Sequence, residues 1–198
     1  METRCELGIE EDEITVLYAP TFRKERNHAG ELGFAFPVKN VLTAFEKRYD
    51  KHIRLIVRAH HADTHSYTYD TGTIDASDYE DMQRLLCAAD ILITDYSSSM
   101  WDFALTGKPC LLYVPDLQEY IATDRGFYTE PETWPGILCE DTEQLIHSIL
   151  SLDEEACATR AKKYLTASGS YETGHACEQV GARIQEVVGI TDIDEGGH

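Results

Sequence analysis

The sequence predicts an α/β fold, in which a mostly parallel sheet is covered by helices on both faces. Short apolar runs, such as residues 55–57 and 91–93, are typical of strands, and segments with apolar residues at helical spacing separate them. This alternation is typical of βαβ units, whose strands are parallel. The strands are continuously apolar, which indicates a sheet that is buried on both faces. At 198 residues the chain is long enough for one domain with a substantial core.

Each expected element follows from local pattern. Val38, Val41 and Phe45 lie on one helical face, and Met82, Leu85 and Leu86 do the same in a later segment. The expected elements of the first half are a short polar helix and turn before residue 14, strand 14–19, helix 38–49, strand 52–59, helix 78–88 and strand 90–94. Two polar stretches, 21–37 and 61–77, are expected to be loops.

The second half begins with a serine-rich turn and a short helix. The elements expected after it are strand 110–114, an edge strand at 137–139 and helices 143–150, 154–165 and 175–188. We expect residues 1–13 to lead into a single domain at 14–190, and residues 191–198 to form a frayed tail.

The charge balance excludes two classes of partner. The chain has 36 acidic and 17 basic residues, which gives a formal net charge of −19. A surface of this sign repels the phosphate backbone of nucleic acids, so nucleic acid is not expected as the main partner. Anionic lipid is disfavoured for the same reason.

Neither a membrane segment nor a metal site is indicated by the sequence. No apolar run approaches 18 residues, and no signal-peptide pattern opens the chain. Six scattered cysteines form neither a C-x-x-C pair nor a cluster at zinc spacing. We therefore expect a reducing cytoplasmic compartment, with no structural metal, disulfide or cofactor. The cysteines are Cys5, Cys87, Cys110, Cys139, Cys157 and Cys177.

The serine turn that follows the strand at 90–94 is the most informative local feature. Ser97 or Ser98 can cap the next helix, Gly107 occupies a position suited to a left-handed residue, and Pro109 prevents continuation. Backbone N–H groups at a helix start, with hydroxyls beside them, can hold phosphate oxygens. An ordinary capped helix explains the same residues, and both roles are compatible.

Polar side chains also follow two other predicted strands. In an open parallel sheet, ligands bind outside the carboxyl ends of the strands, so these clusters are expected to converge. The clusters are Thr21 with Arg23, Arg58 with His60 and His61, and Ser97 with Ser98. Neither a dinucleotide-binding G-x-G-x-x-G fingerprint nor a P-loop is present.

The same clusters belong to motifs that occur together, in this order, in one known family. The first three are Leu17-Tyr18-Ala19-Pro20-Thr21-Phe22-Arg23, Val57-Arg58-Ala59-His60, and Ile93-Thr94-Asp95-Tyr96-Ser97-Ser98 followed by Asp102-Phe103-Ala104. Further matches are Tyr113-Val114-Pro115-Asp116, Tyr120, Arg125-Gly126-Phe127-Tyr128 and Pro135-Gly136. On these motifs the chain resembles the CDP-glycerol glycerophosphotransferases, the teichoic-acid polymerases and primases. It departs at His61, where the family usually has proline.

The resemblance implies a Rossmann-like domain that forms one half of a GT-B enzyme. Members of the family have two such domains facing a cleft, and this chain resembles the C-terminal, donor-binding one. The family's N-terminal acceptor domain, with its histidine in a Trp-His-Gly context, has no counterpart here. Residues 4–9 resemble the inter-domain region, so Met1 is expected to lie within a longer protein.

The reaction that the resemblance implies is attack by an acceptor hydroxyl on the β-phosphorus of CDP-glycerol, or of a related CDP-polyol, with release of CMP. His60 is the expected catalytic residue, because an imidazole can protonate or stabilise the departing phosphate. Ser97 and Ser98 are expected to bind the pyrophosphate, and Arg58 the phosphate or cytidine oxygens.

Four more residues complete the expected site. Pro20, Thr21 and Ala59 would border the nucleotide, and Asp102 could accept hydrogen bonds from ribose or glycerol hydroxyls. Alternative roles remain open: Arg58 could pair with a carboxylate, His60 could be a loop residue bonded to backbone, and Asp102 could simply favour the helix N-terminus.

Two other functions compete with this prediction. One is a GT-B glycosyltransferase domain that uses a nucleotide-sugar donor, and the other is a non-catalytic nucleotide-binding domain of the same fold. By association with the family, the parent protein is expected to be peripheral on the inner face of the bacterial membrane, with no insertion by this part of the chain.

Overall fold

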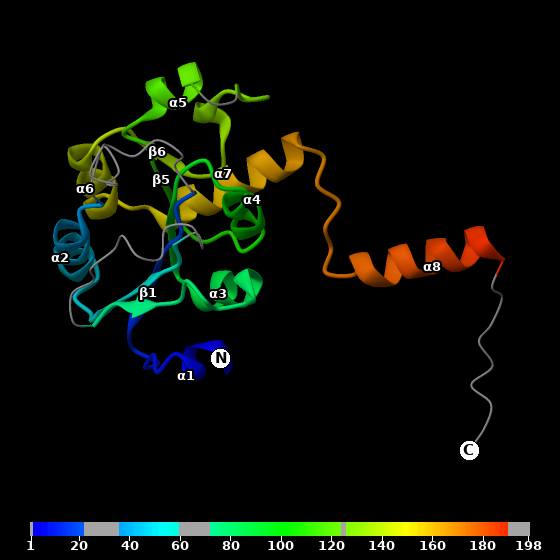
Figure 1. The fold of residues 1–198 in the computed structure, drawn as a ribbon, viewed down its shortest axis with the longest axis horizontal. Coiled ribbons are helices and arrows are strands. Elements are labelled where there is room, and N and C mark those ends of the chain that lie inside the picture. The colour runs from blue at the N-terminus through cyan, green and yellow to red at the C-terminus, as the bar shows by residue number, and fades with distance from the viewer. Residues whose placement is uncertain (1, 22–35, 60–71, 124–125, 190–198) are drawn as a thin grey trace. The chain divides into compact units, whose positions relative to one another are not determined.

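The computed structural model describes residues 2–21, 36–59, 72–123 and 126–189. The chain divides into two compact units, residues 1–165 and 166–198, which we describe separately. The first unit contains the sheet (Figure 1). Among the described residues, no helix combines the length and the apolar character needed to cross a bilayer.

The sheet confirms the predicted fold class. Every paired strand in the described part of the chain runs parallel to its neighbour, in the order β3-β2-β1-β4-β5-β6. The strands are β1 (Ile14–Tyr18), β2 (Ile53–Val57), β3 (Ile74–Asp75), β4 (Ile91–Thr94), β5 (Cys110–Tyr113) and β6 (Ile137–Cys139). This order places β1 between β2 and β4. At β1 the strand order changes direction: β2 and β3 lie on one side of it, and β4, β5 and β6 lie on the other.

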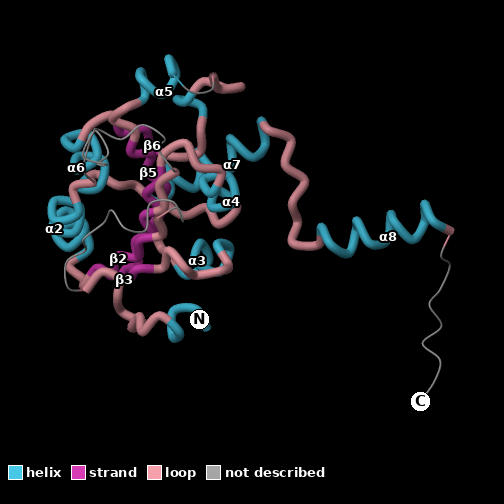
Figure 2. The backbone as a smooth tube through the Cα atoms, in the orientation of Figure 1, coloured by secondary structure: helices cyan, strands magenta, loops and turns pink. Residues whose placement is uncertain are grey.

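Helices cover both faces of the sheet, as the apolar strands required (Figures 1 and 2). One face packs on α2 (Val38–Tyr49) and α6 (Thr142–Leu150), and the other on α3 (Met82–Ala88) and α4 (Ser99–Ala104). Successive residues of β1 alternate between the two cores: Val16 belongs to the α2 side and Leu17 to the α3 side. Both side chains are fully buried.

Aspartate side chains cap the N-termini of three helices. Asp81 accepts a hydrogen bond from the backbone N–H of Arg84 at the start of α3, and Asp141 does the same for Gln144 in α6. Asp153 accepts from the N–H of Ala156 at the start of α7 (Glu154–Ala167). Each aspartate satisfies an N–H that the helix cannot pair internally.

The structure adds elements that the sequence did not predict. β3 lies in a stretch expected to be a polar loop, and α5 (Leu117–Thr123) and a 3-10 turn (Pro131–Thr133) lie in a region expected to be irregular. β3 has only two residues, and its backbone pairs with residues 56 and 57 of β2. A strand this short has no apolar periodicity to detect.

Residues 2–13 belong to the first unit and pack on its core. They include α1 (Glu2–Glu6). Ile9 is buried in the core on the α3 side, and the Arg4 guanidinium donates to Asp90 (3.0 Å) and to the Glu13 carbonyl (2.8 Å). The predicted boundaries of a domain at 14–190 with a frayed tail stay a prediction.

The second unit contains α8 (Ala176–Val188). The helix ends at Gly189, which is left-handed (φ 71°) and whose N–H bonds to the Gln185 carbonyl. All its residues are exposed.

Candidate functional site

The carboxyl ends of β1, β2 and β4 lie together, because β1 is hydrogen-bonded to both neighbours. The last register pairs join Tyr18 to Val57 on one side and to Ile93 on the other. Residues 20–21, 58–59 and 95–98 therefore leave the sheet at the same edge, the edge at which ligands bind in folds of this kind. The structure thus brings together three of the segments that the sequence singled out.

Asp95 and Thr94 connect the ends of β1 and β4. Both carboxylate oxygens of Asp95 lie 3.0 Å from the backbone N–H of Thr21, and the Thr94 hydroxyl donates to the Ala19 carbonyl (2.6 Å). Asp95 is only 3% exposed and Thr94 is fully buried. The sequence places Asp95 in a family motif directly before the serine turn but does not predict its partner across the sheet.

Ser77 performs the same task at the end of β2. Its hydroxyl accepts the backbone N–H of Ala59 (3.1 Å) and donates to a carboxylate oxygen of Asp75 (2.6 Å). The N–H of Ser77 donates to the same oxygen (3.0 Å). Ser77 is buried, and sequence reasoning missed it because it lay in the stretch expected to be a loop.

Arg58 is half-buried and is held by backbone. One terminal nitrogen donates to the Tyr79 carbonyl (3.2 Å), and the buried Nε has no hydrogen-bond partner within the described residues. In that part of the structure Arg58 forms no ion pair, which was the alternative that its sequence context left open. An Arg with donor capacity at this edge is suited to an anionic ligand.

The serine turn differs from a simple capped helix. Ser98 is the N-cap residue of α4, but its side chain makes no capping hydrogen bond. The Ser97 hydroxyl instead accepts from the N–H of Ser99 (3.3 Å) and from its hydroxyl (2.9 Å). Of the two serines predicted to cap the helix, Ser98 therefore does not do so; its backbone is already helical (φ −60°, ψ −16°) instead of extended as at a typical N-cap.

The residues of this turn and of α4 differ in their exposure to solvent. Ser98 and Asp102 are exposed, Ser97 is half-buried and Ser99 is buried. Gly107, beyond the helix, is left-handed (φ 68°), as its position predicted. With six residues, α4 offers little helix dipole, so hydroxyls and turn N–H groups are the available donors.

Aromatic rings pack behind the serine turn. The Tyr96 ring stacks on Tyr120 of α5 with centroids 3.8 Å apart, and its hydroxyl donates to Asp116 (2.9 Å). Phe127 stacks on both rings and meets Trp134 edge-on at 4.8 Å. Trp134 is 2% exposed and belongs to the core. This stack was not predicted.

Several predicted residues lie outside the described residues. They are His60, the expected catalytic residue, and Arg23 and His61 of the polar clusters. Pro20 and Thr21 are half-buried and Ala59 is buried, at the positions described above.

The opposite edge of the sheet carries a polar cluster around the buried carboxylate of Glu13. Glu13, 7% exposed, accepts from Arg54 at 2.7 Å and 3.2 Å and contacts His52 Nδ1 at 2.7 Å. Burial raises the pKa of the Glu13 carboxyl, but hydrogen bonds from Arg54, from the Glu10 backbone and from His52 outweigh it and lower the pKa to about 2. Glu13 is therefore ionised at neutral pH.

The cysteines and acids suggest no metal centre. Cys110, Cys139 and Cys157 are buried, and burial raises the pKa of each thiol. Cys5, Cys87 and Cys177 are exposed. In the part of the chain that the structure describes, no group of three or more His, Cys, Asp or Glu side chains is arranged to hold a metal ion.

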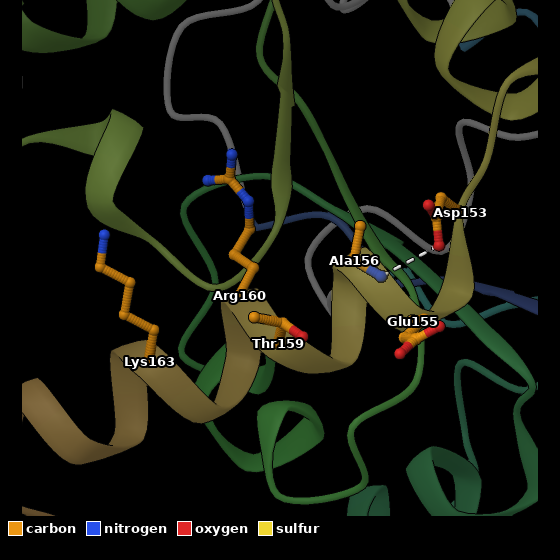
Figure 3. Close-up of a pocket in the computed structure, with 6 residues that line it drawn as sticks. All are labelled: Asp153, Glu155, Ala156, Thr159, Arg160 and Lys163. Carbon is orange, nitrogen blue, oxygen red and sulfur yellow. Dashed lines mark hydrogen bonds between the residues drawn. The ribbon is translucent and has the colours of Figure 1, made fainter.

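A hollow of about 530 Å³ runs along α7 (Figure 3). Its lining residues are exposed, and Arg160 donates to the carbonyls of Glu132 (3.1 Å) and Trp134 (3.3 Å). The lining consists of Asp153, Glu155, Ala156, Thr159, Arg160 and Lys163. None of the predicted site residues lies there, and the carboxyl edge of the sheet remains the candidate site.

A family model decides the relationship that the motifs suggested. Residues 1–186 match the model for CDP-glycerol:poly(glycerophosphate) glycerophosphotransferase. The chain belongs to this family. It is 37% identical over 147 residues to a teichoic acid poly(glycerol phosphate) polymerase of Bacillus spizizenii, a match that covers 72% of this chain and 37% of the relative. It is 33% identical over 155 residues to a teichoic acid glycerol-phosphate transferase of Staphylococcus aureus, covering 77% of this chain and 40% of the relative.

Solved structures agree with the sequence relatives. The H444N variant of the wall teichoic acid polymerase TagF superposes with a TM-score of 0.75 at 27% identity, over 95% of this chain and 47% of that one. A structure of the same variant soaked with CDPG matches with a TM-score of 0.74 at 26% identity, with the same coverage. The chain thus spans about 40% of the length of the first curated relatives and about half of the solved polymerase.

Proposed function

We propose that this chain is the donor-binding domain of a transferase that moves glycerol phosphate from CDP-glycerol, or another polyol phosphate from its CDP derivative, to an acceptor hydroxyl. Family membership supports the reaction class. The observation that carries the proposal is the convergence of residues 20–21, 58–59 and 95–98 at one edge of the sheet, because these segments contain the family's motifs.

The proposed step is an in-line displacement at phosphorus. A bond forms between the acceptor oxygen and the β-phosphorus, while the bond from that phosphorus to the bridging oxygen breaks. CMP leaves with the electron pair, and the acceptor hydroxyl loses its proton. Such a transfer requires positioned reactants and neutralised phosphate charge.

The residues of this chain supply donors for that neutralisation. We assign Ser97, Ser98 and Arg58 to the pyrophosphate, and His60 to protonation or stabilisation of the CMP phosphate. The exposed hydroxyl of Ser98 and the incompletely paired guanidinium of Arg58 support these roles. Pro20, Thr21 and Ala59 would border the nucleotide, and the exposed Asp102 would accept from ribose or glycerol hydroxyls.

The proposed partner of this domain is an N-terminal acceptor domain of the same parent protein. The support is length: the matched relatives are more than twice as long as the segment that they share with this chain. In a two-domain enzyme of this kind the acceptor would bind the other half of the cleft. We therefore expect the 198-residue chain to bind nucleotide without turnover. We also propose that the parent acts at the cytoplasmic face of the membrane.

Calorimetry with a panel of nucleotides tests the proposal. The 198-residue chain is titrated with CMP, CDP-glycerol, CDP-ribitol and a UDP-sugar. Binding of the cytidine compounds, with a preference among the two polyols that identifies the donor, supports it. A preference for the UDP-sugar would instead assign the domain to a glycosyltransferase, and no binding of any compound would overturn the proposed function.

A double variant tests the location of the site. Replacing Ser97→Ala together with Ser98→Ala should weaken CMP binding about tenfold or more, because phosphate loses two hydroxyl donors. Ser151→Ala is the control, since Ser151 is exposed at the end of α6 and its hydroxyl donates to the His147 carbonyl of its own helix (2.8 Å). Unchanged CMP affinity in the double variant would remove the serine turn from the site.

A further inference from the structure

We propose that Asp95 is a positioning residue of the donor site, which holds residues 20–21 against the serine turn in the geometry that binds the nucleotide. This inference rests on the proposed function. It concerns a buried acid that touches backbone, so Asp95 would act on the ligand only through the segments that it joins.

The backbone ladder between β1 and β4 ends before the site. Its last bond joins the Ala19 N–H to the Ile93 carbonyl (3.0 Å). The residue after Ala19 is Pro20, which has no N–H and cannot continue the ladder. The two segments therefore need another connection if they are to stay together beyond the strands.

Side chains of β4 and its extension provide that connection. The Thr94 hydroxyl binds the Ala19 carbonyl at 2.6 Å, and the Asp95 carboxylate binds the next available donor, the N–H of Thr21, through both oxygens at 3.0 Å. Thr94 and Asp95 thus extend the pairing of the two strands for two residues. A carboxylate suits this position because it can reach past the proline and accept from a backbone N–H as a strong, charged acceptor.

The position of Asp95 in the chain links this connection to the proposed ligand. Asp95 lies two residues before Ser97 and three before Ser98, and Thr21 is the residue expected to border the nucleotide. At 3% exposure the carboxylate is shielded from solvent, so its bond to Thr21 is not replaced by water. Loss of the bond should let residues 20–21 move relative to the serine turn.

The experiment compares CMP affinity in the 198-residue chain and three variants, at a temperature where circular dichroism shows each to be folded. Asp95→Ala removes both acceptor oxygens and should weaken binding roughly tenfold to a hundredfold, the size of effect that small misplacements of binding groups produce. Asp95→Asn keeps one acceptor for the Thr21 N–H and should restore affinity to within about threefold. Thr94→Val keeps the side-chain shape and should weaken binding severalfold.

Glu13→Gln is the matched control. Glu13 is also a buried carboxylate, but it directly precedes β1 and therefore lies at the amino ends of the strands. The Glu13→Gln substitution should lower the melting temperature and leave CMP affinity unchanged. A merely structural Asp95 would behave in the same way.

The outcomes separate this inference from the proposed function. If the unmodified chain binds no cytidine nucleotide, the proposed function fails and the inference with it. If the unmodified chain binds CMP and folded Asp95→Ala binds equally well, only the inference is overturned. If Asp95→Ala does not fold, Thr94→Val decides: unchanged affinity in that variant overturns the inference, and a severalfold loss together with rescue in Asp95→Asn supports it.

Discussion

The two edges of the sheet are held together mainly by different kinds of side-chain contact. At the amino edge, charged side chains pair: Glu13 with Arg54, and Arg4 with Asp90, whose carboxylate also accepts the backbone N–H of Thr15 (2.9 Å). At the carboxyl edge, short side chains bind backbone instead: Asp95 binds the N–H of Thr21, Thr94 the carbonyl of Ala19, and Ser77 the N–H of Ala59.

The difference has a physical reason. Long charged side chains pair with one another across the amino edge and leave few donors for a ligand. Short acceptors at the carboxyl edge hold the main chain, and the Nε of Arg58 has no hydrogen-bond partner among the described residues. We infer that the amino edge serves mainly stability, whereas the carboxyl edge combines stability with binding.

Glu13→Ala should have the largest effect on stability. It leaves Arg54, whose side chain is only 22% exposed, without its buried partner. Breaking such a pair costs about 3–5 kcal/mol, so urea unfolding should show a loss of that size. CMP affinity at a temperature where the variant is folded should not change. A loss of affinity would break the proposed division between the two edges.

Lowering the pH should reveal the contribution of Glu13 to the stability of the unmodified chain. The folded-state pKa of Glu13 is lowered from 4.5 to about 2. The stability that its ionisation contributes is therefore fully present above about pH 4.5, and is lost as the pH falls toward 2. At about 1.4 kcal/mol per pKa unit, the difference corresponds to about 3 kcal/mol. Urea unfolding at several pH values should show this loss in the unmodified chain and a shallower one in Glu13→Gln; equal slopes would contradict it.

Ser77→Ala tests the carboxyl edge with a smaller change. The substitution leaves the buried N–H of Ala59 without its acceptor, at a cost of about 2 kcal/mol. Unlike Glu13→Ala, it should also weaken CMP binding severalfold, because Ala59 belongs to a segment of the proposed site. Ser151→Ala, which removes an exposed hydroxyl at the end of α6, serves as the control and should change neither quantity. Intact CMP affinity in Ser77→Ala would mean that the end of β2 contributes stability alone.

Ser98→Ala should have the smallest effect on stability and the clearest effect on binding. The Ser98 side chain is exposed and makes no capping bond, so its removal should change the free energy of unfolding by less than about 0.5 kcal/mol. Calorimetry should show CMP affinity about tenfold weaker. A stability loss without a binding loss would reverse the role assigned to this residue.

Most of the architecture could be predicted from local pattern. The strand predicted at 14–19 is β1 at Ile14–Tyr18, the helix predicted at 38–49 coincides with α2, and the one predicted at 143–150 begins one residue earlier, as α6. These elements bury long apolar faces, whose period is visible in the sequence. β3 and α5 escaped prediction because the first is two residues long and the second has much of its surface exposed.

The site was predictable in its location and less so in its contacts. Strand ends in a parallel sheet share an edge, so residues as distant as Thr21, Arg58 and Ser98 could be expected to converge. That Ser98 would not cap α4, and that Arg58 would bind the Tyr79 carbonyl, depended on local backbone geometry.

The amino-acid sequence alone determined the parallel α/β architecture, the motifs that assign the family and the edge at which they meet, because periodicity and chain order are local properties. Only the tertiary structure decided which side chains hold that edge together. Asp95 and Thr21 are 74 residues apart, and Ser77 and Ala59 are 18 apart. Such pairs depend on the register between strands, which is set by the packing of the whole sheet.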